Sequence, residues 1–129
     1  ARLAKRSLTN ARVMQADARV FLREIVPNAS LQAIHFYFPD PWWKKRHHKR
    51  RIWNSELFAE FERALAPNGV LHLASDVAMV FDEMCACARE RPGLREDRSA
   101  ELEPPCTTNF EDKAGAEGRV VGRTAFVRD

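Results

Sequence analysis

The residues best suited to chemistry lie in one segment, from Phe36 to Arg51. It begins with Phe-Tyr-Phe-Pro-Asp-Pro-Trp-Trp and continues, from Lys44 to Arg51, with six lysines and arginines, two histidines and no acid. A run of charge is by itself most often a solvated surface, so the aromatic neighbours carry the interpretation. Aromatic faces stack on nucleobases and cations pair with phosphates, which favours binding of a nucleic acid. One of Trp42 and Trp43 is expected in the core.

The basic excess of the chain is confined to this segment. The 129 residues include 21 lysines and arginines against 18 acidic residues, a net charge of +3. Six of the basic residues lie between Lys44 and Arg51, so the rest of the chain is net acidic. We therefore expect one basic surface on an otherwise acidic protein.

Composition and cysteine content narrow the class of protein. At 129 residues and 45% hydrophobic content, we expect one globular domain over residues 1–129. No apolar run reaches the length of a membrane span, and the chain starts without a signal peptide, which predicts a cytoplasmic protein. Cys85, Cys87 and Cys106 are an odd set without paired zinc-type spacing, so we expect free thiols and no metal.

Hydrophobic spacing predicts strands and helices in alternation. The predicted strands are 12–15, 33–38, 70–75 and 123–127. The predicted helices are 18–26, a segment that starts after Asn54 or Ser55 and stops at Asn68-Gly69, and 79–89. This order predicts an α/β fold with mainly parallel strands.

Three aspartates, Asp17, Asp40 and Asp76, directly follow predicted strands. The carboxyl ends of parallel strands meet at one edge of an open α/β sheet, where ligands bind, so we expect all three at that edge. Helix capping is the ordinary role for Asp17 and Asp76. Asp40 lies between two prolines and cannot easily begin a helix, so it is the aspartate that most needs a functional explanation.

Three sequence elements resemble one enzyme family. The segment from Phe38 to Arg51, FPDPWWKKRHHKRR, closely resembles the signature of the tRNA (guanine-N7-)-methyltransferases. Ala74-Ser75-Asp76 follows in the right order, and Thr107-Thr108-Asn109-Phe110-Glu111 resembles the Thr-Lys-Phe-Glu element of that family. With Asp17, the resemblance extends from about Asn10 to the C-terminus.

The resemblance implies a fold, a reaction and a set of site residues. It implies a Rossmann-like class I methyltransferase sheet with helices on both faces. The implied reaction moves a methyl group from S-adenosyl-L-methionine to N7 of a guanosine in the tRNA variable loop. Asp17 and Asp40 are implied to bind the cofactor, with Asp40 also the catalytic carboxylate. Implied substrate-binding residues are Lys44, Asp76, Thr108, Asn109, Phe110 and Glu111, with Asn109 in place of the usual lysine.

The basic segment then has a defined partner. We expect Lys45, Arg46, Lys49, Arg50 and Arg51 to contact tRNA phosphates, because each such cation releases counterions on binding. Arg50 and Arg51 are equally suited to structural ion pairs, and Glu111 to a place on the surface. No membrane and no metal are expected as partners, and the protein is expected to be a monomer or a homodimer.

The resemblance lacks one part of the family pattern. The family opens with a strand and a Gly-rich loop for the methionine end of the cofactor, and neither is found in this sequence. The methyltransferase domain is therefore expected to be incomplete at its N-terminus. An alternative is a non-catalytic tRNA- or RNA-binding module that uses the basic aromatic segment 42–51. A scaffold subunit that binds an acidic protein is a further alternative.

Overall fold

The computed structural model describes residues 7–100 and 108–129. In these residues one sheet has the strand order β1-β2-β4-β3, with β1 at Leu31–Tyr37, β2 at Leu65–Ser75, β3 at Leu94–Glu96 and β4 at Gly122–Arg128. Strands β1 and β2 are parallel, whereas β4 runs antiparallel to both β2 and β3. The predicted α/β class is confirmed, but the expectation of mainly parallel strands is wrong, because only one of the three strand pairs in the described residues is parallel.

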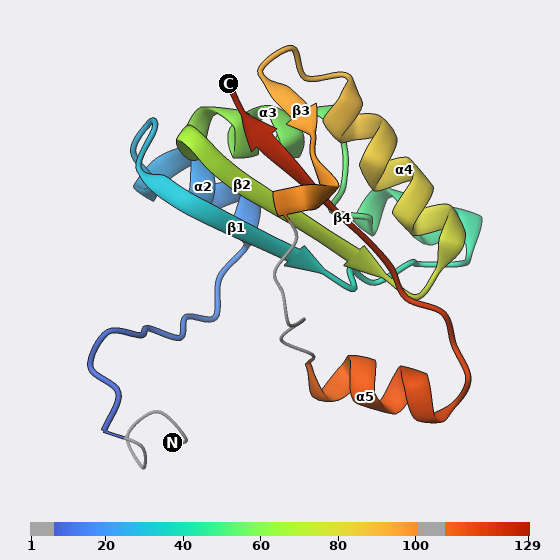
Figure 1. Cartoon of the computed structure of the whole chain (residues 1–129). Coiled ribbons are helices and arrows are strands. Elements are labelled where there is room, and N and C mark those ends of the chain that lie inside the picture. The colour runs from blue at the N-terminus through green and yellow to red at the C-terminus, as the bar shows by residue number, and fades with distance from the viewer. Residues whose placement is uncertain (1–6, 101–107) are drawn as a thin grey trace.

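Three helices lie together on one face of the sheet (Figure 1): α2 (Ala18–Ile25), α3 (Ser55–Ala64) and α4 (Ala78–Arg89). A fourth helix, α5 (Asn109–Ala116), lies apart from this layer (Figure 1). Helices were expected on both faces of the sheet. Within the described residues, the helical layer covers one face. Two short 3-10 helices complete the fold, η1 (Lys45–Arg50) and η2 (Arg98–Ala100), and η2 packs against β4.

The core lies between the sheet and this helical layer. Alternate residues of the paired strands face the helices, as the two-residue period of a strand requires. Phe36 of β1 contacts Phe58 and Phe61 of α3, with ring centroids 6.2 and 5.4 Å apart. Phe126 of β4 and Met84 of α4 are fully buried in the same cluster. The pairing of β1 with β2 is therefore stabilised by α3, the helix between them in the chain, which packs on Phe36.

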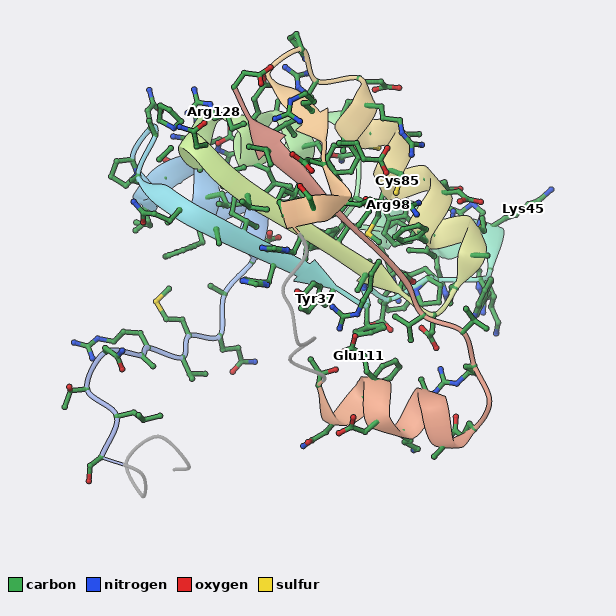
Figure 2. All side chains as sticks on the ribbon, in the orientation of Figure 1. Tyr37, Lys45, Cys85, Arg98, Glu111 and Arg128 are labelled. Carbon is green, nitrogen blue, oxygen red and sulfur yellow. The ribbon has the colours of Figure 1, made fainter. Side chains whose placement is uncertain are left out.

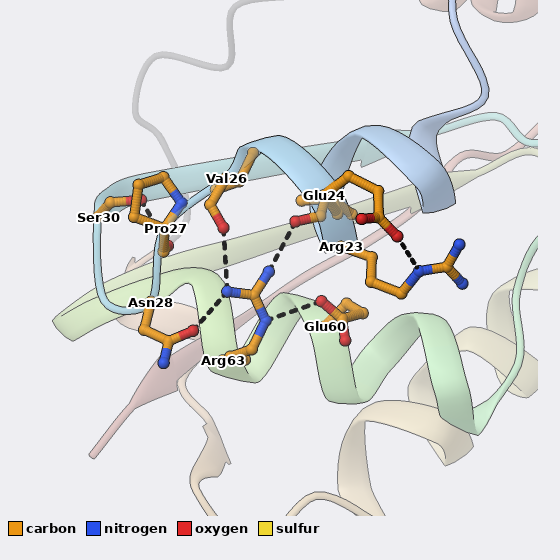
Figure 3. A network of polar contacts seen from close by, with 9 residues as sticks. Arg23, Glu24, Val26, Pro27, Asn28, Ser30, Glu60 and Arg63 are labelled. Carbon is orange, nitrogen blue, oxygen red and sulfur yellow. Dashed lines mark hydrogen bonds and ion pairs between the residues drawn. The ribbon is translucent and has the colours of Figure 1, made fainter.

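Arg63 of α3 joins that helix to α2 (Figure 3). Its guanidinium donates to the backbone oxygens of Leu22 and Val26, at 2.7 and 3.0 Å, and to Asn28 Oδ1 at 2.6 Å. Glu60 accepts from Nε at 2.8 Å. The last carbonyls of a helix have no partner within the helix, so Arg63 satisfies the end of α2 with a charged donor.

One predicted strand and one predicted helix end are wrong. Residues 12–15 form no strand, since Val13 and Met14 are 85% and 59% exposed, and an extended segment without a paired neighbour and a buried face is not stabilised. Helix α3 ends at Ala64, before the Asn68-Gly69 stop that the sequence indicated. Those two residues lie inside β2, and Asn68 adopts a φ of +63°.

Gly69 is required by the close approach of two backbone segments. A Cβ atom there would lie 2.8 Å from the oxygen of Ala66 and 2.9 Å from that of Leu31. The register of β1 against β2 shifts at this point, between Leu31 and Ala33. The Asn-Gly pair thus accommodates an irregularity of the sheet rather than a helix terminus. In the described part of the chain, no helix has the length and apolarity to cross a membrane.

Candidate functional site at the carboxyl edge of the sheet

The two parallel strands end side by side. Tyr37 at the end of β1 pairs with Ala74 of β2, and the Phe38 amide donates to the Ala74 oxygen at 2.9 Å. The loops that carry Asp40 and Asp76 therefore leave the sheet at the same edge, as expected. Asp17 differs, because it follows no strand and instead caps the N-terminus of α2.

The loop around Asp40 is held in a strained conformation. Phe38 and Trp42 have φ values of +50° and +47°, in the left-handed region that bulky residues rarely adopt. Such strain is kept where a structure needs a particular loop shape, and it is concentrated at functional sites. Asp40 is exposed and, with Trp43 and Lys44, lines a hollow of about 460 Å³. Its carboxylate is open to a ligand.

The tryptophans of this segment take different roles from those expected. Trp42 is half-buried, with His47 edge-on at 5.7 Å and the Arg50 guanidinium over its ring at 5.1 Å. Trp43 is 65% exposed. The core tryptophan is Trp53, which is buried and donates through Nε1 to Glu83 at 2.7 Å. Neither Trp42 nor Trp43 is in the core, so Trp43 offers a free aromatic face.

The basic segment forms η1 and divides into two kinds of cation. Lys45, Arg46 and Lys49 are exposed, and Lys45 points away from the body of the protein (Figure 2). Arg51 is different, because only 14% of its side chain is exposed and Nε donates to the Pro41 oxygen at 2.8 Å. It also lies over Trp53, 5.2 Å from the ring centroid, and 3.6 Å from Glu83. Arg51 is thus engaged in holding the loop.

Asp76 is paired rather than capping. Its side chain is 10% exposed and forms an ion pair with Arg119. Helix α4 begins after Val77 without a side-chain cap, and the Val77 amide donates to Ser75 Oγ at 3.1 Å. Asp76 and Arg119, with Ser75 and Phe81 among their neighbours, line a hollow of about 370 Å³. Asp76 is the buried carboxylate of this edge that reaches a cavity.

Helix α5 begins with a complete capping box. The Glu111 amide donates to Thr108 Oγ1 at 3.2 Å, and the Thr108 amide donates to Glu111 Oε2 at 2.6 Å. The Glu111 side chain is 5% exposed and also pairs with Arg123 of β4. Glu111 is therefore buried and does not occupy the surface position that its sequence context also allowed. Figure 2 shows Glu111 on the side of α5 nearest the sheet, below Tyr37. Asn109 is exposed in the first turn.

Aromatic contacts join α5 to the Asp40 loop. Phe110, 44% exposed, packs on Phe38 with ring centroids 4.7 Å apart. Arg119 lies over the Phe110 ring at 5.3 Å, and Arg123 over the Tyr37 ring at 5.6 Å. The residues implied to bind substrate at Asp76, Thr108, Phe110 and Glu111 are therefore gathered at one edge. Thr107 and Cys106 lie outside the described residues.

Arg119 and Arg123 are the site residues that the sequence did not reveal. Each pairs with an acid from a distant segment, and Arg119 lies 43 residues from Asp76 along the chain. In the sequence, Arg119 lies in a glycine-rich segment and Arg123 lies in a predicted strand. Neither spacing nor composition indicates an acidic partner for either arginine. Only the position of α5 against the sheet brings these charges together.

The Asp17 carboxylate accepts hydrogen bonds from Arg19 of α2, the helix that it caps. Arg19 donates to both of its oxygens, through the amide and Nε to Oδ1 and through Nη2 to Oδ2, at 2.8 to 3.2 Å. These hydrogen bonds lower the pKa of Asp17 to about 2. The residues around Asp17, including Met14, Ala16 and Phe21, line an apolar hollow of about 290 Å³. Asp17 thus lies in the chain between Ala16 and Ala18, two residues that line this hollow together with Arg12.

Two histidines of the sheet and a cysteine of α4 favour their neutral forms. Burial lowers the pKa of His35 and of His72, whose rings stack at 4.6 Å, and His35 Nδ1 lies 2.8 Å from the Tyr37 hydroxyl. Burial raises the pKa of Cys85 to about 11, which makes it a poor nucleophile. Across residues 7–100 and 108–129, no cluster of three or more His, Cys, Asp or Glu could hold a metal ion.

Comparison with curated sequences gives consistent relatives. The "tRNA (guanine-N(7)-)-methyltransferase" of Paracidovorax citrulli is 35% identical over 98% of this chain and 52% of its own length. The protein of the same name from Thiobacillus denitrificans is 37% identical over 98% of this chain and 57% of its own length. The chain spans about half the length of the curated relatives it matches.

A solved structure from Thermus thermophilus, titled a "Putative DNA Modification Methylase", superposes with a TM-score of 0.54 at 17% identity. The match covers 88% of this chain and 52% of that one. Its complex with S-adenosyl-L-methionine gives a TM-score of 0.50. These likenesses show the methyltransferase fold. The family model Methyltransf_4, described as "Putative methyltransferase", matches residues 1–124, and the chain therefore belongs to this methyltransferase family.

Proposed function

We propose that the protein transfers a methyl group from S-adenosyl-L-methionine to N7 of a guanosine in the variable loop of tRNA. The observation that carries this proposal is the match of 98% of the chain to relatives named tRNA (guanine-N(7)-)-methyltransferase, at 35% and 37% identity. The geometry of the carboxyl edge supports it, because acids, an exposed tryptophan and a basic helix lie around the end of β1 and β2. With such a substrate, we infer that the protein acts in the cytoplasm.

The reaction makes limited demands on the side chains. Guanine N7 carries an in-plane lone pair, so no general base is needed to create the nucleophile. The bound cofactor supplies an electrophilic methyl group on its sulfonium. The protein must hold the base in line with that methyl group and exclude water, and positioning of this kind supplies several kcal/mol of the barrier. It must also stabilise the positive charge that develops on the ring.

Asp40 is suited to the charge-stabilising role. It is exposed within the strained loop, beside the hollow that Trp43 and Lys44 also line. A carboxylate held near the methylated ring stabilises the positive charge that develops there. We therefore assign Asp40 as the catalytic carboxylate and as a contact for the cofactor.

Asp17 is suited to the adenine side of the cofactor. A carboxylate offers about four lone-pair positions, and Arg19 uses three of them. One acceptor position is left for an exocyclic amine. The apolar hollow lined by Met14, Ala16 and Phe21 fits the flat ring of a purine. These observations support cofactor binding at this end of the site.

The tRNA is assigned to the edge and to η1. Asp76 borders the cavity at the edge and is assigned to the target guanine. Phe110, in the first turn of α5, contacts Arg119 of the same cavity. The exposed cations Lys45, Arg46 and Lys49 are assigned to phosphates. Arg51 holds the loop and is assigned a structural role. Phosphate contacts position the tRNA, whereas contacts to the base select it.

The test is transfer of radiolabelled methyl from S-adenosyl-L-methionine to unmodified tRNA, with 7-methylguanosine identified in the digested product. This chain is assayed beside the protein expressed from its complete reading frame. A tRNA that carries 7-deazaguanosine at the target is the matched control, because it lacks only the accepting nitrogen. Label in 7-methylguanosine from ordinary tRNA supports the proposal. Absence of label from both proteins, with tRNA still bound, would point to an RNA-binding module instead.

A further inference from the structure

The Asp76–Arg119 pair has an unusual arrangement for a structural ion pair. Arg119 reaches Asp76 through one nitrogen, Nη1, and contacts only Oδ2. Its other nitrogens are held elsewhere, with Nε at 3.0 Å and Nη2 at 2.8 Å from Glu117 Oε2. The Phe110 ring supports the guanidinium from one side at 5.3 Å. Arg119 thus keeps its own anchors if Asp76 takes another partner.

The partner that Asp76 needs has the same chemistry as Arg119. The N1–C2–N2 edge of guanine is a planar guanidine unit that presents N1–H and N2–H side by side. A carboxylate accepts both in parallel, as it accepts the fork of an arginine. Guanine would engage both oxygens of Asp76, whereas Arg119 engages one. The hollow of about 370 Å³ that Asp76 and Arg119 line together has room for a purine.

We propose that Arg119 occupies, on Asp76, the place that the N1–N2 edge of the target guanine takes when tRNA binds. This inference rests on the proposed function and adds to it a residue that competes with the substrate. Asp76 is only 10% exposed, and a buried carboxylate without a partner is costly. Arg119 keeps Asp76 paired through one nitrogen in the free protein, and guanine takes its place with two parallel hydrogen bonds.

The exchange also selects the base. Adenine carries an unprotonated N1, which would oppose the carboxylate, and it cannot displace a guanidinium. Inosine keeps N1–H but lacks the N2 amine, so it offers one bond where guanine offers two. The proposal therefore predicts an order of affinity of guanosine, then inosine, then adenosine, set by how fully each replaces Arg119.

The first experiment measures nucleoside binding by NMR titration of the protein expressed from its complete reading frame. Guanosine, inosine and adenosine are the probes. We expect Arg119→Ala to tighten guanosine binding by about tenfold, because a charge-assisted hydrogen bond no longer competes. Arg119→Lys keeps one competing charge without the planar fork, and we expect a gain of about threefold. Adenosine binding should not change.

A second variant shifts the competition in the opposite direction. Glu117→Gln weakens the alternative anchor of Arg119, so Arg119 should hold Asp76 more firmly and guanosine should bind about threefold more weakly. Glu117 is exposed, so this change does not threaten the fold. Arg91→Ala is the matched control, since Arg91 pairs with Glu62 at 2.7 Å in a similarly half-buried contact on the helical layer. It should leave all three affinities unchanged.

The outcomes separate this inference from the proposed function. Weaker or unchanged guanosine binding in Arg119→Ala, with a folded protein, would overturn the exchange and leave Arg119 as a positioning residue. Stronger guanosine binding in Glu117→Gln would overturn it as well. Since binding is measured without methyl transfer, a failure of the methylation assay alongside the expected binding shifts would reject the proposed reaction alone.

Discussion

At the scale of single residues, Glu111 has the strongest structural constraints of the site. Its carboxylate closes the capping box of α5 through Oε2 and pairs with Arg123 through Oε1. With 5% of its side chain exposed, it has little capacity left for a substrate in this arrangement. Its first effect is therefore to fix where Thr108 and Phe110 lie, and any contact with guanine must be shared with that role.

Glu111→Gln should test this structural role. The amide keeps an oxygen for the Thr108 amide but removes the charge that Arg123 faces, and loss of one partner of a buried pair is strongly destabilising. We expect the free energy of unfolding to fall by about 2 kcal/mol, measured by urea denaturation. The exposed Asp112→Asn in the same turn is the control and should change it by less than about 0.5 kcal/mol. Equal effects would contradict the assignment.

Asp40 and Asp76 should separate in kinetics. Asp40 faces the developing charge in our proposal, so Asp40→Asn should lower kcat by about a hundredfold and change the KM for tRNA little. Asp76 holds the base, and Asp76→Asn should mainly raise the KM for tRNA. Steady-state methylation of tRNA by the protein from its complete reading frame gives both constants. Equal, small losses in the two variants would remove the catalytic assignment of Asp40.

At the scale of elements, local pattern predicted the strands and helices whose signals lie within one segment. The helix at 18–26 and its Asp17 cap, the strands ending near Tyr37 and Ser75, and the α/β class are confirmed. The failures depended on distant neighbours. Residues 12–15 have a strand-like pattern but no paired strand, and Asn68-Gly69 is set by the approach of Leu31. The acids of the site were visible in the sequence, whereas their arginine partners were not.

The contact between α2 and α3 gives a prediction about elements. Arg63 satisfies the backbone oxygens of Leu22 and Val26 at the end of α2 from the neighbouring helix (Figure 3). Arg63→Ala leaves these carbonyls without their charged donor, and we expect about 2 kcal/mol less stability in urea denaturation. Amide exchange should rise in α2 before it rises in β2. Arg23→Ala, which removes an exposed pair with Glu24, is the control and should have little effect.

At the scale of the whole molecule, charge and chemistry are placed on separate elements. The sheet edge gathers the acids with Arg119 and Arg123, while the exposed cations lie on η1, beyond the Asp40 loop. In the proposed function, a basic helix attached to an acid-rich edge would hold the tRNA backbone without filling the cavity assigned to the base. The strained Asp40 loop connects the two, and Arg51 fixes it through Pro41 and Trp53.

This separation predicts how salt acts on binding. Each phosphate contact makes the logarithm of the tRNA affinity fall more steeply with the logarithm of salt concentration, by about one unit. Replacing Lys45, Arg46 and Lys49 together by alanine should therefore flatten that slope by about three units, measured by filter binding across a salt series. Arg23→Ala, an exposed arginine on α2, should leave the slope unchanged. Because η1 lies outside the edge cavity, the triple variant should also keep the wild-type order of guanosine over adenosine, and loss of that order would show that η1 takes part in reading the base.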